Sequence, residues 1–583
     1  MSYQSVTGKN WALNEFNSNE VLEYSQKKGF SSLLSKLLSI RKITIDKSDL
    51  FLDPKIKDFL PNPNVLKDME LASNLLINAI LNKKKICVFG DYDVDGASAT
   101  AIIINFLKNF YDNYIIYIPD RITEGYGPTL EAFKKIINDG INFIITVDCG
   151  TTSFEAIDYA YNNNTEVIIL DHHQADISIP KCKALVNPKQ INDSSNLNYL
   201  CAAGVAFLFI VSTNKILREK KYYTENNIKE PELLDFLDLV ALGTVCDVVP
   251  LLQLNRALVY QGLKILKKRK NIGIKTLFDL LNVSEAPNAY QLGFVIGPRI
   301  NAGGRIGKSN LGSLLLTTED AKTAYQIANQ LNELNVKRKS IEENILKEAF
   351  ALAETEKNND VIIVSSKLWH EGLIGIIASR IKEKYSKPTI VITETNIIAK
   401  GSCRSIVGFD IGLNIVLAKQ NNLILKGGGH VMAAGFSINK NKISEFKNFI
   451  FQSYSKTKKN ININLDMNID EIITANSVNE KTFEEIDKLA PFGSGNPEPR
   501  FMIENLTPLK INFENENLIK YLFKDNSNIY LTALCFKNNK ENIIDYLKNL
   551  KNNKFNIIGR INKNVWNKQK TFEFLIDDLC LVS

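Results

Sequence analysis

Short apolar runs alternate with amphipathic stretches in the first half of the chain. A helical stretch over residues 99–110 follows the first run, and the spacing of the later runs leaves room for further helices. Strands that alternate with helices are typical of a parallel α/β sheet. The runs expected to form strands are residues 86–89, 115–118, 141–147 and 167–170.

The second half of the chain shows three other patterns. Residues 318–357 contain no Pro or Gly and carry many charges, which predicts a long, solvent-exposed helix that connects two domains. A second α/β unit begins at the apolar run 361–364. Short apolar runs with little helix between them follow near the end and predict a small β-barrel. These last runs are residues 501–503, 529–531, 555–558 and 572–575.

These patterns together predict an α/β protein of several domains. At roughly 100–200 residues per domain, a chain of 583 residues corresponds to three or four domains. A parallel-sheet α/β domain is joined by the long helix to a second α/β domain, and a β-barrel follows. The expected boundaries are an N-terminal lead-in at 1–45, the first α/β domain at 46–317, the connecting helix at 318–357, the second α/β domain at 358–455 and the barrel at 460–583.

Composition limits the class of protein without fixing a function. Hydrophobic residues make up 45% and charged residues 23% of the chain, which is ordinary for a globular protein. The formal net charge of +7 permits a polyanionic partner without demanding one. The eight cysteines form no CxxC pair, which favours reduced thiols. The polar start and the lack of a long apolar run lead us to expect a cytoplasmic protein without a membrane span.

Acidic and imidazole side chains follow the expected strands where each strand ends. The carboxyl ends of parallel strands meet at one edge of the sheet, where open α/β sheets bind ligands. A solvated acidic turn is an alternative for residues 91–95 alone, but the whole set favours a metal site. The side chains are Asp91, Asp93 and Asp95 after the first strand, Asp148 after the third, Asp171, His172 and His173 after the fourth, and Asp247 after a helical segment.

This donor set suits two hard divalent cations. Mg²⁺ and Mn²⁺ prefer carboxylate oxygens, and Mn²⁺ also accepts imidazole. A pair of such ions is a common solution for phosphodiester hydrolysis. We therefore expect two Mn²⁺ or Mg²⁺ ions as cofactors. The expected ligands are Asp93, Asp95, Asp148, His172 and Asp247.

The motifs around these residues resemble the DHH phosphoesterase superfamily, in the version found in the RecJ family. Residues 171–173 read Asp-His-His, the signature that names the superfamily. Residues 91–96, 148–150 and 243–250 resemble its other motifs. The resemblance implies a DHH catalytic domain followed by a DHH-associated domain.

The same resemblance implies roles for single residues. Asp148 would bridge the two metals, and His173 would contact the scissile phosphate or donate a proton. Asp91 would be a supporting or outer ligand, and we group it with Asp148 and His173 as catalytic. Phe89 stands where some relatives have a histidine, four residues before the first metal-binding aspartate.

Motifs rich in glycine and arginine predict substrate binding. Residues 297–305 combine two arginines with glycines, and such glycines let backbone N–H groups approach phosphate while arginine binds it. A glycine-rich turn with surface arginines is the alternative. Residues 401–405 and 427–435 are interpreted in the same way and resemble the DHH-associated domain. The expected substrate-binding residues of these motifs are Arg299, Asn301, Arg305, Ser402, Arg404, Gly428, Gly429 and His430.

The resemblance also implies a pocket for a terminal 5′ phosphate, formed by Arg121, Ser402 and Arg404. Such a pocket would set the polarity of cleavage, because only a strand end can place its phosphate there. Tyr126 lies between two glycines and is expected to stack on a base from a loop. A core aromatic is the alternative. His370 is assigned to the same cleft.

Residues 489–499 resemble the segment that enters the OB-fold in the RecJ family. OB barrels commonly bind single strands through basic grooves and aromatic side chains. A solvated basic hairpin is an equal alternative for the basic residues near the end of the chain. Those residues, with one aromatic, are Lys563, Trp566, Lys568 and Lys570.

The resemblance covers roughly residues 50–583 and implies an exonuclease of DNA repair and recombination. It would degrade single-stranded DNA from 5′ to 3′ into 5′ mononucleotides by two-metal hydrolysis. Single-stranded DNA would be its partner, with a single-strand-binding protein and a helicase as further candidates. One alternative is a DHH phosphodiesterase for short oligonucleotides, cyclic dinucleotides or pyrophosphate, but such relatives are generally shorter and lack the barrel. The other is a non-catalytic replication scaffold, but such relatives have lost metal ligands.

Overall fold

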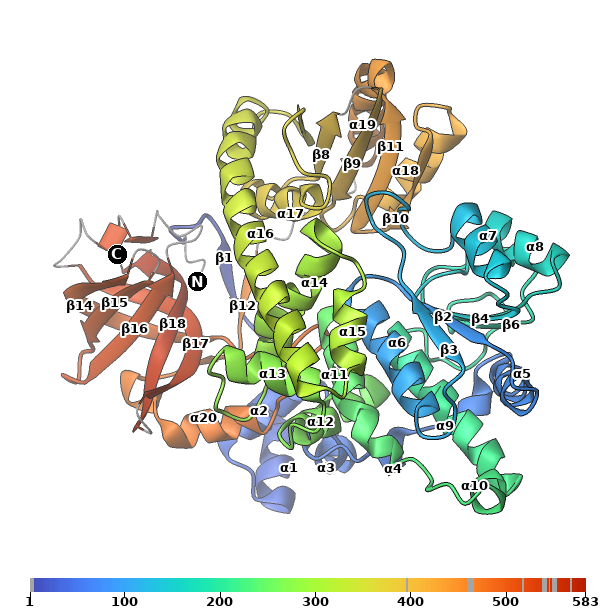
Figure 1. Cartoon of the computed structure of the whole chain (residues 1–583). Coiled ribbons are helices and arrows are strands. Elements are labelled where there is room, and N and C mark those ends of the chain that lie inside the picture. Colours follow the sequence, from blue (N-terminus) through green and yellow to red (C-terminus); the bar gives the residue numbers. More distant parts are fainter. Residues whose placement is uncertain are drawn as a thin grey trace. The chain divides into compact units, whose positions relative to one another are not determined.

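The chain folds into two compact units that are each described by themselves. The computed structural model describes residues 5–394, 397–458, 466–515, 518–536, 543–544, 546–547, 553–566 and 569–582. The larger unit is Phe59–Ile463, and the smaller unit combines Met1–Asp58 with Asn464–Ser583. In Figure 1 the smaller unit contains both the dark blue and the red ends of the chain. No helix among the described residues is long and apolar enough to cross a membrane.

A five-stranded parallel sheet organises the first α/β domain, as the sequence predicts. Its strand order is β3-β2-β4-β5-β6, and every neighbouring pair is parallel. The central strands β2 and β4 are buried along their whole length, which parallel strands covered on both faces require. The strands are β2 (Ile86–Phe89), β3 (Tyr114–Tyr117), β4 (Phe143–Val147), β5 (Glu166–Leu170) and β6 (Ala184–Val186).

Helices cover both faces of this sheet (Figure 1). Phe89 and alternate residues of the central strands pack with Phe133 of α7 and Ile157 of α8. Helices α5, α6 and α9 pack against one another and contact strands of the same sheet. The helical elements of this part are η2 (Pro63–Val65), α5 (Met69–Leu81), α6 (Val94–Leu107), α7 (Leu130–Asn138), α8 (Phe154–Asn162), α9 (Ala202–Glu219) and α10 (Tyr222–Glu225).

A group of helices follows the sheet, and one of them differs from the sequence-based expectation. Residues 297–305 form helix α14, so the alternative of a glycine-rich turn is wrong, and phosphate binding by this motif stays a prediction. The glycines allow close packing instead: a Cβ on Gly297 would lie 2.6 Å from the Cys246 sulfur, and one on Gly304 would lie 3.0 Å from Tyr92. The elements are η3 (Leu233–Phe236), α11 (Leu237–Cys246), α12 (Gln253–Leu266), α13 (Ile272–Leu280), η4 (Gln291–Ile296), α14 (Gly297–Ile306) and α15 (Leu311–Thr317).

The buried Asp238 in the first turn of α11 predicts a pH-dependent stability. Burial raises the pKa of this carboxyl to about 7, and the charge of Asp235 adds to the shift. Because the folded-state pKa lies above the unfolded value, the stability that the neutral acid contributes is lost as the pH rises from about 4 through about 7. Asp238→Asn should therefore gain stability over the parent between pH 5 and pH 8, by roughly 2–3 kcal/mol.

Urea unfolding at the two pH values measures this gain. Asp139→Asn, at an exposed position, is the matched control and should change nothing. An equal effect of Asp238→Asn at pH 5 and pH 8 would contradict the assignment of a neutral buried acid.

The predicted connecting helix is present as α16 (Ala321–Thr355). It links the first α/β domain to the second and buries small residues such as Ala324 and Ala328 on one face. Arg338 and Glu342 form a buried ion pair one turn apart on this helix. One face of the helix therefore packs against the domains that it connects, while most of its remaining surface is exposed, as the sequence predicts.

The second α/β domain contains a five-stranded mixed sheet of order β10-β11-β9-β8-β7. Only the β7–β8 pair is parallel among its described pairings. Helices α16 and α17 pack with residues on one face and α18 and α19 with residues on the other. The elements are β7 (Ile362–Ser366), α17 (Ile374–Tyr385), β8 (Thr389–Glu394), β9 (Ile398–Arg404), α18 (Ile411–Gln420), β10 (Lys426–His430), β11 (Ala433–Asn439), η5 (Lys440–Lys442) and α19 (Ile443–Thr457).

The smaller unit contains the expected β-barrel. It also contains the N-terminal residues of the chain, which the sequence analysis did not assign to the barrel. Its sheet has the order β13-β14-β15-β16-β18-β17, and pairing of β14 with β17 closes the ring. The described elements are β12 (Asp466–Ile469), β13 (Glu471–Ile472), η7 (Ala475–Ser477), α20 (Glu480–Asp487), β14 (Phe501–Asn515), β15 (Leu518–Lys524), β16 (Tyr530–Phe536), β17 (Phe555–Trp566) and β18 (Gln569–Leu581).

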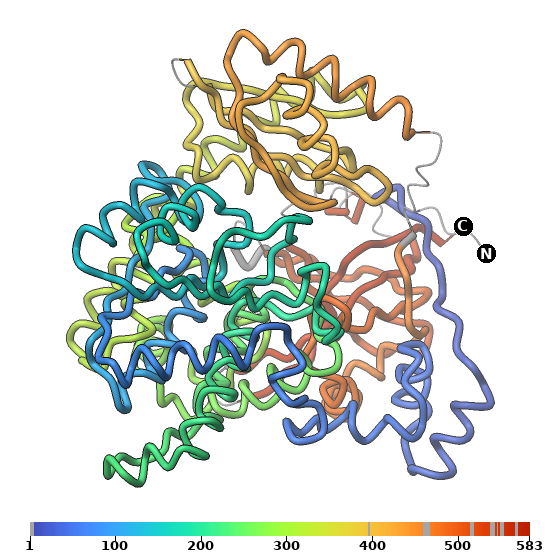
Figure 2. The backbone as a smooth tube through the Cα atoms, turned by 90° about the vertical axis from the view of Figure 1, so that its right-hand side faces the viewer, coloured from blue at the N-terminus to red at the C-terminus, as the bar shows by residue number. Residues whose placement is uncertain are grey.

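The first residues of the chain are part of this barrel unit. Strand β1 pairs in parallel with β12, and Tyr24 and Leu37 join the barrel core. Figure 2 shows the blue N-terminal segment running beside the orange and red C-terminal segments. The N-terminal elements are β1 (Asn10–Leu13), α1 (Ser18–Lys28), α2 (Ser32–Ile40), η1 (Ile45–Lys47) and α3 (Ser48–Leu52), and α4 (Ile56–Phe59) ends where the larger unit begins.

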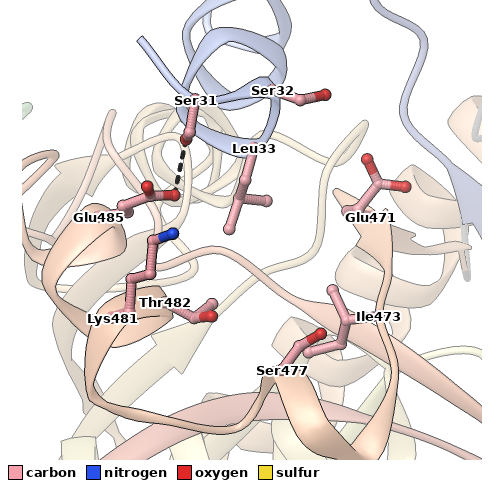
Figure 3. A pocket seen from close by; sticks show the side chains of 9 residues that line it. All are labelled: Ser31, Ser32, Leu33, Glu471, Ile473, Ser477, Lys481, Thr482 and Glu485. Atoms are coloured by element: carbon pink, nitrogen blue, oxygen red, sulfur yellow. Dashed lines mark hydrogen bonds between the residues drawn. The ribbon is translucent and has the colours of Figure 1, made fainter.

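A pocket of about 400 Å³ lies where these N-terminal helices meet the residues before the barrel (Figure 3). Ser31 donates a hydrogen bond to Glu485 of α20 at 2.6 Å across it. Leu33 and Ile473 contribute apolar lining, and Lys481 lies close by. The pocket belongs to the smaller unit, whereas all the expected metal ligands belong to the larger one.

Candidate active site

The loop after β2 and the first turn of α6 hold three aspartates in fixed positions. Asp93 caps α6, because its Oδ1 accepts the N–H of Gly96 at 3.0 Å. A Cβ on Gly96 would lie 2.8 Å from the carbonyl oxygen of Asp91, so the turn requires glycine. The two oxygens of Asp95 accept the first two backbone N–H groups of α9, at 2.6 and 2.9 Å. The positive end of that helix favours the charged carboxylate.

Asp148 follows β4 in a left-handed conformation with φ of 62°. Aspartate and asparagine adopt this conformation more readily than most residues. The carboxylate is buried, and its Oδ1 has no hydrogen-bond partner among the described residues. A buried carboxylate oxygen without a partner is costly unless a cation or a proton compensates it.

His172 and His173 have different environments although they are neighbours. Burial lowers the pKa of His172 to about 3, and the charge of His173 adds to the shift, so its ring is neutral and can ligate. Burial alone would also lower the pKa of His173, but the hydrogen bond and charge of Asp171 outweigh it and raise the pKa to about 9. The Nδ1 of His173 lies 2.8 Å from Asp171 Oδ1. Asp171 is therefore an orienting residue for His173.

Three sets of donor atoms meet at this edge of the sheet. Within each set the donor atoms lie within 4.8 Å of one another, and Asp148 and His172 each belong to two sets. The sets are therefore contiguous, as two neighbouring cations would require. They are Asp91 with Asp93 and Asp148, Asp95 with His172 and Asp247, and Asp148 with His172 and His173.

Burial and mutual repulsion disfavour the charged form of these carboxyl groups. Burial raises the pKa of Asp95 to about 6 and of Asp247 to about 8, and neighbouring aspartates add to both shifts. The pKa values of Asp91 and Asp148 are raised for the same reasons. Divalent cations among the carboxylates would relieve the repulsion, and the donor types fit Mn²⁺ or Mg²⁺.

The second α/β domain reaches this cluster through His430. Its ring stacks on His173, with 6.0 Å between ring centroids and 18° between ring planes. Gly428 and Gly429 lie on the same strand β10 and are not buried. Tyr126 is exposed in a loop, so it is not an aromatic residue of the core. Its hydroxyl donates to the Asp148 carbonyl at 2.8 Å.

Arginines gather beside the cluster, and we use the name arginine pocket for the group Arg121, Arg305, Arg404 and Ser402. Arg404 donates from Nη1 to the Ser402 hydroxyl at 3.3 Å. Arg305 donates to the Gly372 carbonyl at 3.1 Å, and Arg121 lies over the Tyr92 ring at 5.2 Å.

Positive charge accumulates in the arginine pocket. The pKa of Arg305 is lowered to about 10, mainly by burial and also by the charges of Arg121, Arg338 and Arg404. His370 is also affected, since burial lowers its pKa and the charge of Arg121 contributes. Guanidinium groups that repel one another in a buried place favour the binding of an anion.

Two residues expected to bind substrate lie elsewhere on α14. Arg299 donates to Asn332 of α16 at 3.0 Å and to the Val295 carbonyl at 2.6 Å. Asn301 is half-buried on the same helix. Neither has a described contact with the arginine pocket, so their role in substrate binding stays a prediction.

Lys189 is a residue of this region that the sequence analysis missed. Its charge lowers the pKa values of His172, His430 and Asp247, so it lies near all three. It follows β6, the strand that the sequence analysis also missed. Recognition of that short strand would have placed Lys189 at the same sheet edge as the aspartates.

The expected DNA-binding residues of the barrel are only partly described. Lys570 is paired with Glu480 of α20 at 2.8 Å, and Lys563 lies opposite Phe572 in the β17–β18 pairing. The side chain of Trp566 and all of Lys568 lie outside the described residues. A basic groove on this barrel therefore stays a prediction.

Comparison with known proteins agrees with this arrangement. Family models match residues 85–244 (DHH family, N-terminal domain), 358–456 (DHHA1 domain) and 469–578 (RecJ OB domain). The single-stranded-DNA-specific exonuclease RecJ of Haemophilus influenzae is 34% identical over 520 residues, which are 87% of this chain and 89% of that protein. This chain belongs to the RecJ family. RecJ of Escherichia coli is 35% identical over 426 residues, which are 71% of this chain and 73% of its own.

Solved RecJ structures extend the likeness to the fold. The crystal structure of RecJ from Thermus thermophilus in complex with Mn²⁺ has a TM-score of 0.80 and 26% identity, and it covers 98% of this chain and 79% of that chain. An exonuclease RecJ bound to manganese has a TM-score of 0.58 and 30% identity, over 69% of this chain and 98% of that chain. The carboxylate and imidazole groups described above suit the ion that these relatives hold.

Proposed function

We propose that this member of the RecJ family is a metal-dependent exonuclease that degrades single-stranded DNA from the 5′ end and releases 5′ mononucleotides. The observation that carries the proposal is the arginine pocket beside the aspartate–histidine cluster, both within the larger unit. A pocket for a terminal phosphate next to a hydrolytic cluster suits an enzyme that removes one end nucleotide at a time. The curated relatives are named single-stranded-DNA-specific exonucleases.

Two ions would be held by the donor sets of the cluster. Asp91, Asp93 and Asp148 would hold one, and Asp95, His172 and Asp247 would hold the other, with Asp148 also next to His172. Such ions, when bound, supply charge neutralisation for the phosphate and acidify a water molecule for attack.

The chain's own residues would position the strand and handle one proton. In the arginine pocket, Arg404 and Arg305 would bind the terminal 5′ phosphate, which sets the first phosphodiester at the cluster. His173, held by Asp171, would lie at that phosphodiester and donate a proton to the departing 3′ oxygen of the end nucleotide. The Tyr126 hydroxyl would hold the backbone of Asp148 and keep its carboxylate in place. The shortened strand would again carry a 5′ phosphate, so the same pocket would serve every cycle.

Digestion of a single-stranded DNA oligonucleotide labelled at one end or the other tests this function. With Mn²⁺ or Mg²⁺, a 5′ label should appear at once as mononucleotide, while a 3′ label stays on progressively shorter strands. Duplex DNA of the same sequence should resist. Early loss of a 3′ label, or cleavage confined to di- to pentanucleotides or cyclic dinucleotides, would overturn the proposal.

We further propose a cytoplasmic role in DNA repair and recombination with two kinds of partner. Because the enzyme would need an unpaired end, a helicase would have to supply single strands from duplex DNA. A single-strand-binding protein would then cover the substrate that the nuclease must reach. The eight free thiols suit a reducing compartment. A helicase that fails to make duplex DNA digestible in a mixed reaction would contradict this coupling.

A further inference from the structure

Two aromatic rings are stacked on each other at the surface of the larger unit. Tyr290 and Phe294 have ring centroids 5.0 Å apart and an angle of 26° between their planes. Their exposed fractions are 66% and 70%, so the pair is open to solvent rather than part of a core. Exposure of two large rings side by side is unfavourable in water and marks a place where something binds.

This pair lies next to the metal cluster. A Cβ on Gly293 would lie 3.5 Å from Val245, and the Cys246 sulfur donates to the Leu292 carbonyl at 3.4 Å. Asp247, one residue further, belongs to the donor set with Asp95 and His172. Val248, which follows it, has 68% of its surface exposed.

A continuous helix joins the rings to the arginine pocket. The backbone stays helical from η4 into α14, because both Ile296 and Gly297 have right-handed helical angles. Gly297 packs at Cys246, and Gly304 packs at Tyr92, beside Asp91. Arg305 at the far end enters the arginine pocket. The aromatic pair and the pocket are therefore at opposite ends of a helix that runs along the cluster.

The length of this helix fits a short piece of single strand. The eight steps from Gly297 to Arg305 rise roughly 12 Å, and the rings lie beyond the Gly297 end. Stacked nucleotides advance about 3.4 Å each along a strand, so the distance corresponds to a few nucleotides. Lys189 near Asp247 provides positive charge for the intervening phosphates.

We propose that Tyr290 and Phe294 form a platform on which bases of the DNA strand stack on the 3′ side of the scissile phosphodiester. The inference rests on the proposed 5′ exonuclease function and adds the exit path of the uncut strand. Every base offers a π-face, so the platform holds any sequence. With the 5′ phosphate in the arginine pocket, the platform holds the other end of the bound segment, so that the strand is extended across the cluster. It thereby favours long single strands over dinucleotides, which cannot span both sites.

The test compares the full-length protein with Tyr290→Ala/Phe294→Ala on a 5′-phosphorylated thymidine dinucleotide and dodecanucleotide. The KM for the dodecanucleotide should rise about fivefold or more, since stacking on an aromatic ring contributes at least that factor per base. The KM for the dinucleotide and the kcat for both should stay unchanged. Tyr290→Phe/Phe294→Tyr, which keeps both rings, should behave as the parent.

Tyr161→Ala is the matched control, because Tyr161 is exposed on α8 and packs with Lys181 instead. An unchanged KM for the dodecanucleotide, or an equal rise for both substrates, overturns the platform while the exonuclease function stands. If the parent cleaves no single strand, the proposed function fails, and fluorescence anisotropy with the dodecanucleotide still tests the platform. A parent that sediments as a dimer and a double variant that sediments as a monomer with unchanged DNA affinity would assign the pair to a second copy of the chain and reject the platform.

Discussion

Asp148→Asn should abolish cleavage of single-stranded DNA, with kcat lowered at least about 10²-fold, while the affinity for the strand stays within a factor of about three. The carboxylate is buried, shares a donor set with Asp91 and Asp93, and lies 3.3 Å from the Nε2 of His172. Removal of one charge from a buried ionic group costs about 3–5 kcal/mol, and each 1.36 kcal/mol in the barrier is tenfold in rate. In the proposed function the arginine pocket would bind the strand, so strand binding should persist.

Asparagine is preferred to alanine at this position because φ is 62°. Asparagine adopts that conformation readily and keeps the side-chain shape, so the fold should be retained. Calorimetry with Mn²⁺ gives a readout besides activity: the variant should lose at least one high-affinity ion. Asp176→Asn, at an exposed position five residues after Asp171, should leave turnover and ion binding unchanged. Retained turnover in Asp148→Asn would exclude Asp148 from the ion-binding set.

The sheet that positions this residue could be predicted because its strands are apolar throughout. Strand β2 has the predicted bounds, and β4 and β5 end at the predicted residues, so the aspartates after them were placed at one edge. Strand β6 is only Ala184–Val186 and lacks a clear pattern. Lys189 was missed with it, since its relevance depends on lying at the end of that strand.

Packing over long sequence distances was not visible in local patterns. The first residues look like a polar lead-in, yet Trp11 donates to Asp578 at 3.1 Å and β1 pairs with β12. An isolated strand of four residues has no partner in its own neighbourhood, so no local signal can announce that pairing. The stacked aromatic pair of Tyr290 and Phe294 was equally hidden, because exposure depends on the finished surface.

The glycine-rich motif shows why residue types alone misled. Glycines beside arginines suit backbone contact with a phosphate, but they equally suit a helix that must approach its neighbours closely. The motif at residues 297–305 is such a helix, and its two arginines have different contacts. Arg305 enters the arginine pocket, whereas Arg299 is held by Asn332. A helical spacing of six residues places the two side chains on different faces.

Arg404→Ala should raise the KM for strands with a 5′ phosphate by about 10- to 100-fold and leave kcat nearly unchanged. A hydrogen bond to a charged group contributes roughly 1.5–3 kcal/mol, which converts to that range. In the proposed role the pocket would bind the end of the strand equally in the ground state and during cleavage, so Arg404→Ala should raise KM rather than lower kcat. Relief of repulsion with Arg121 and Arg305 offsets part of the effect.

The decisive measurement is the ratio of kcat/KM for a 5′-phosphorylated strand to that for the same strand with a 5′ hydroxyl. The parent should prefer the phosphate, and Arg404→Ala should bring the ratio close to one, because the hydroxyl strand never used the guanidinium. Arg218→Ala is the matched control: it removes an exposed arginine that pairs with Glu230 at the C-terminal end of α9, whereas the N-terminal end of that helix binds Asp95. A purely structural role of Arg404 would lower both rates together and leave the ratio intact. Only an effect on the ratio places the terminal phosphate in the arginine pocket, and with it the origin of the 5′ to 3′ direction.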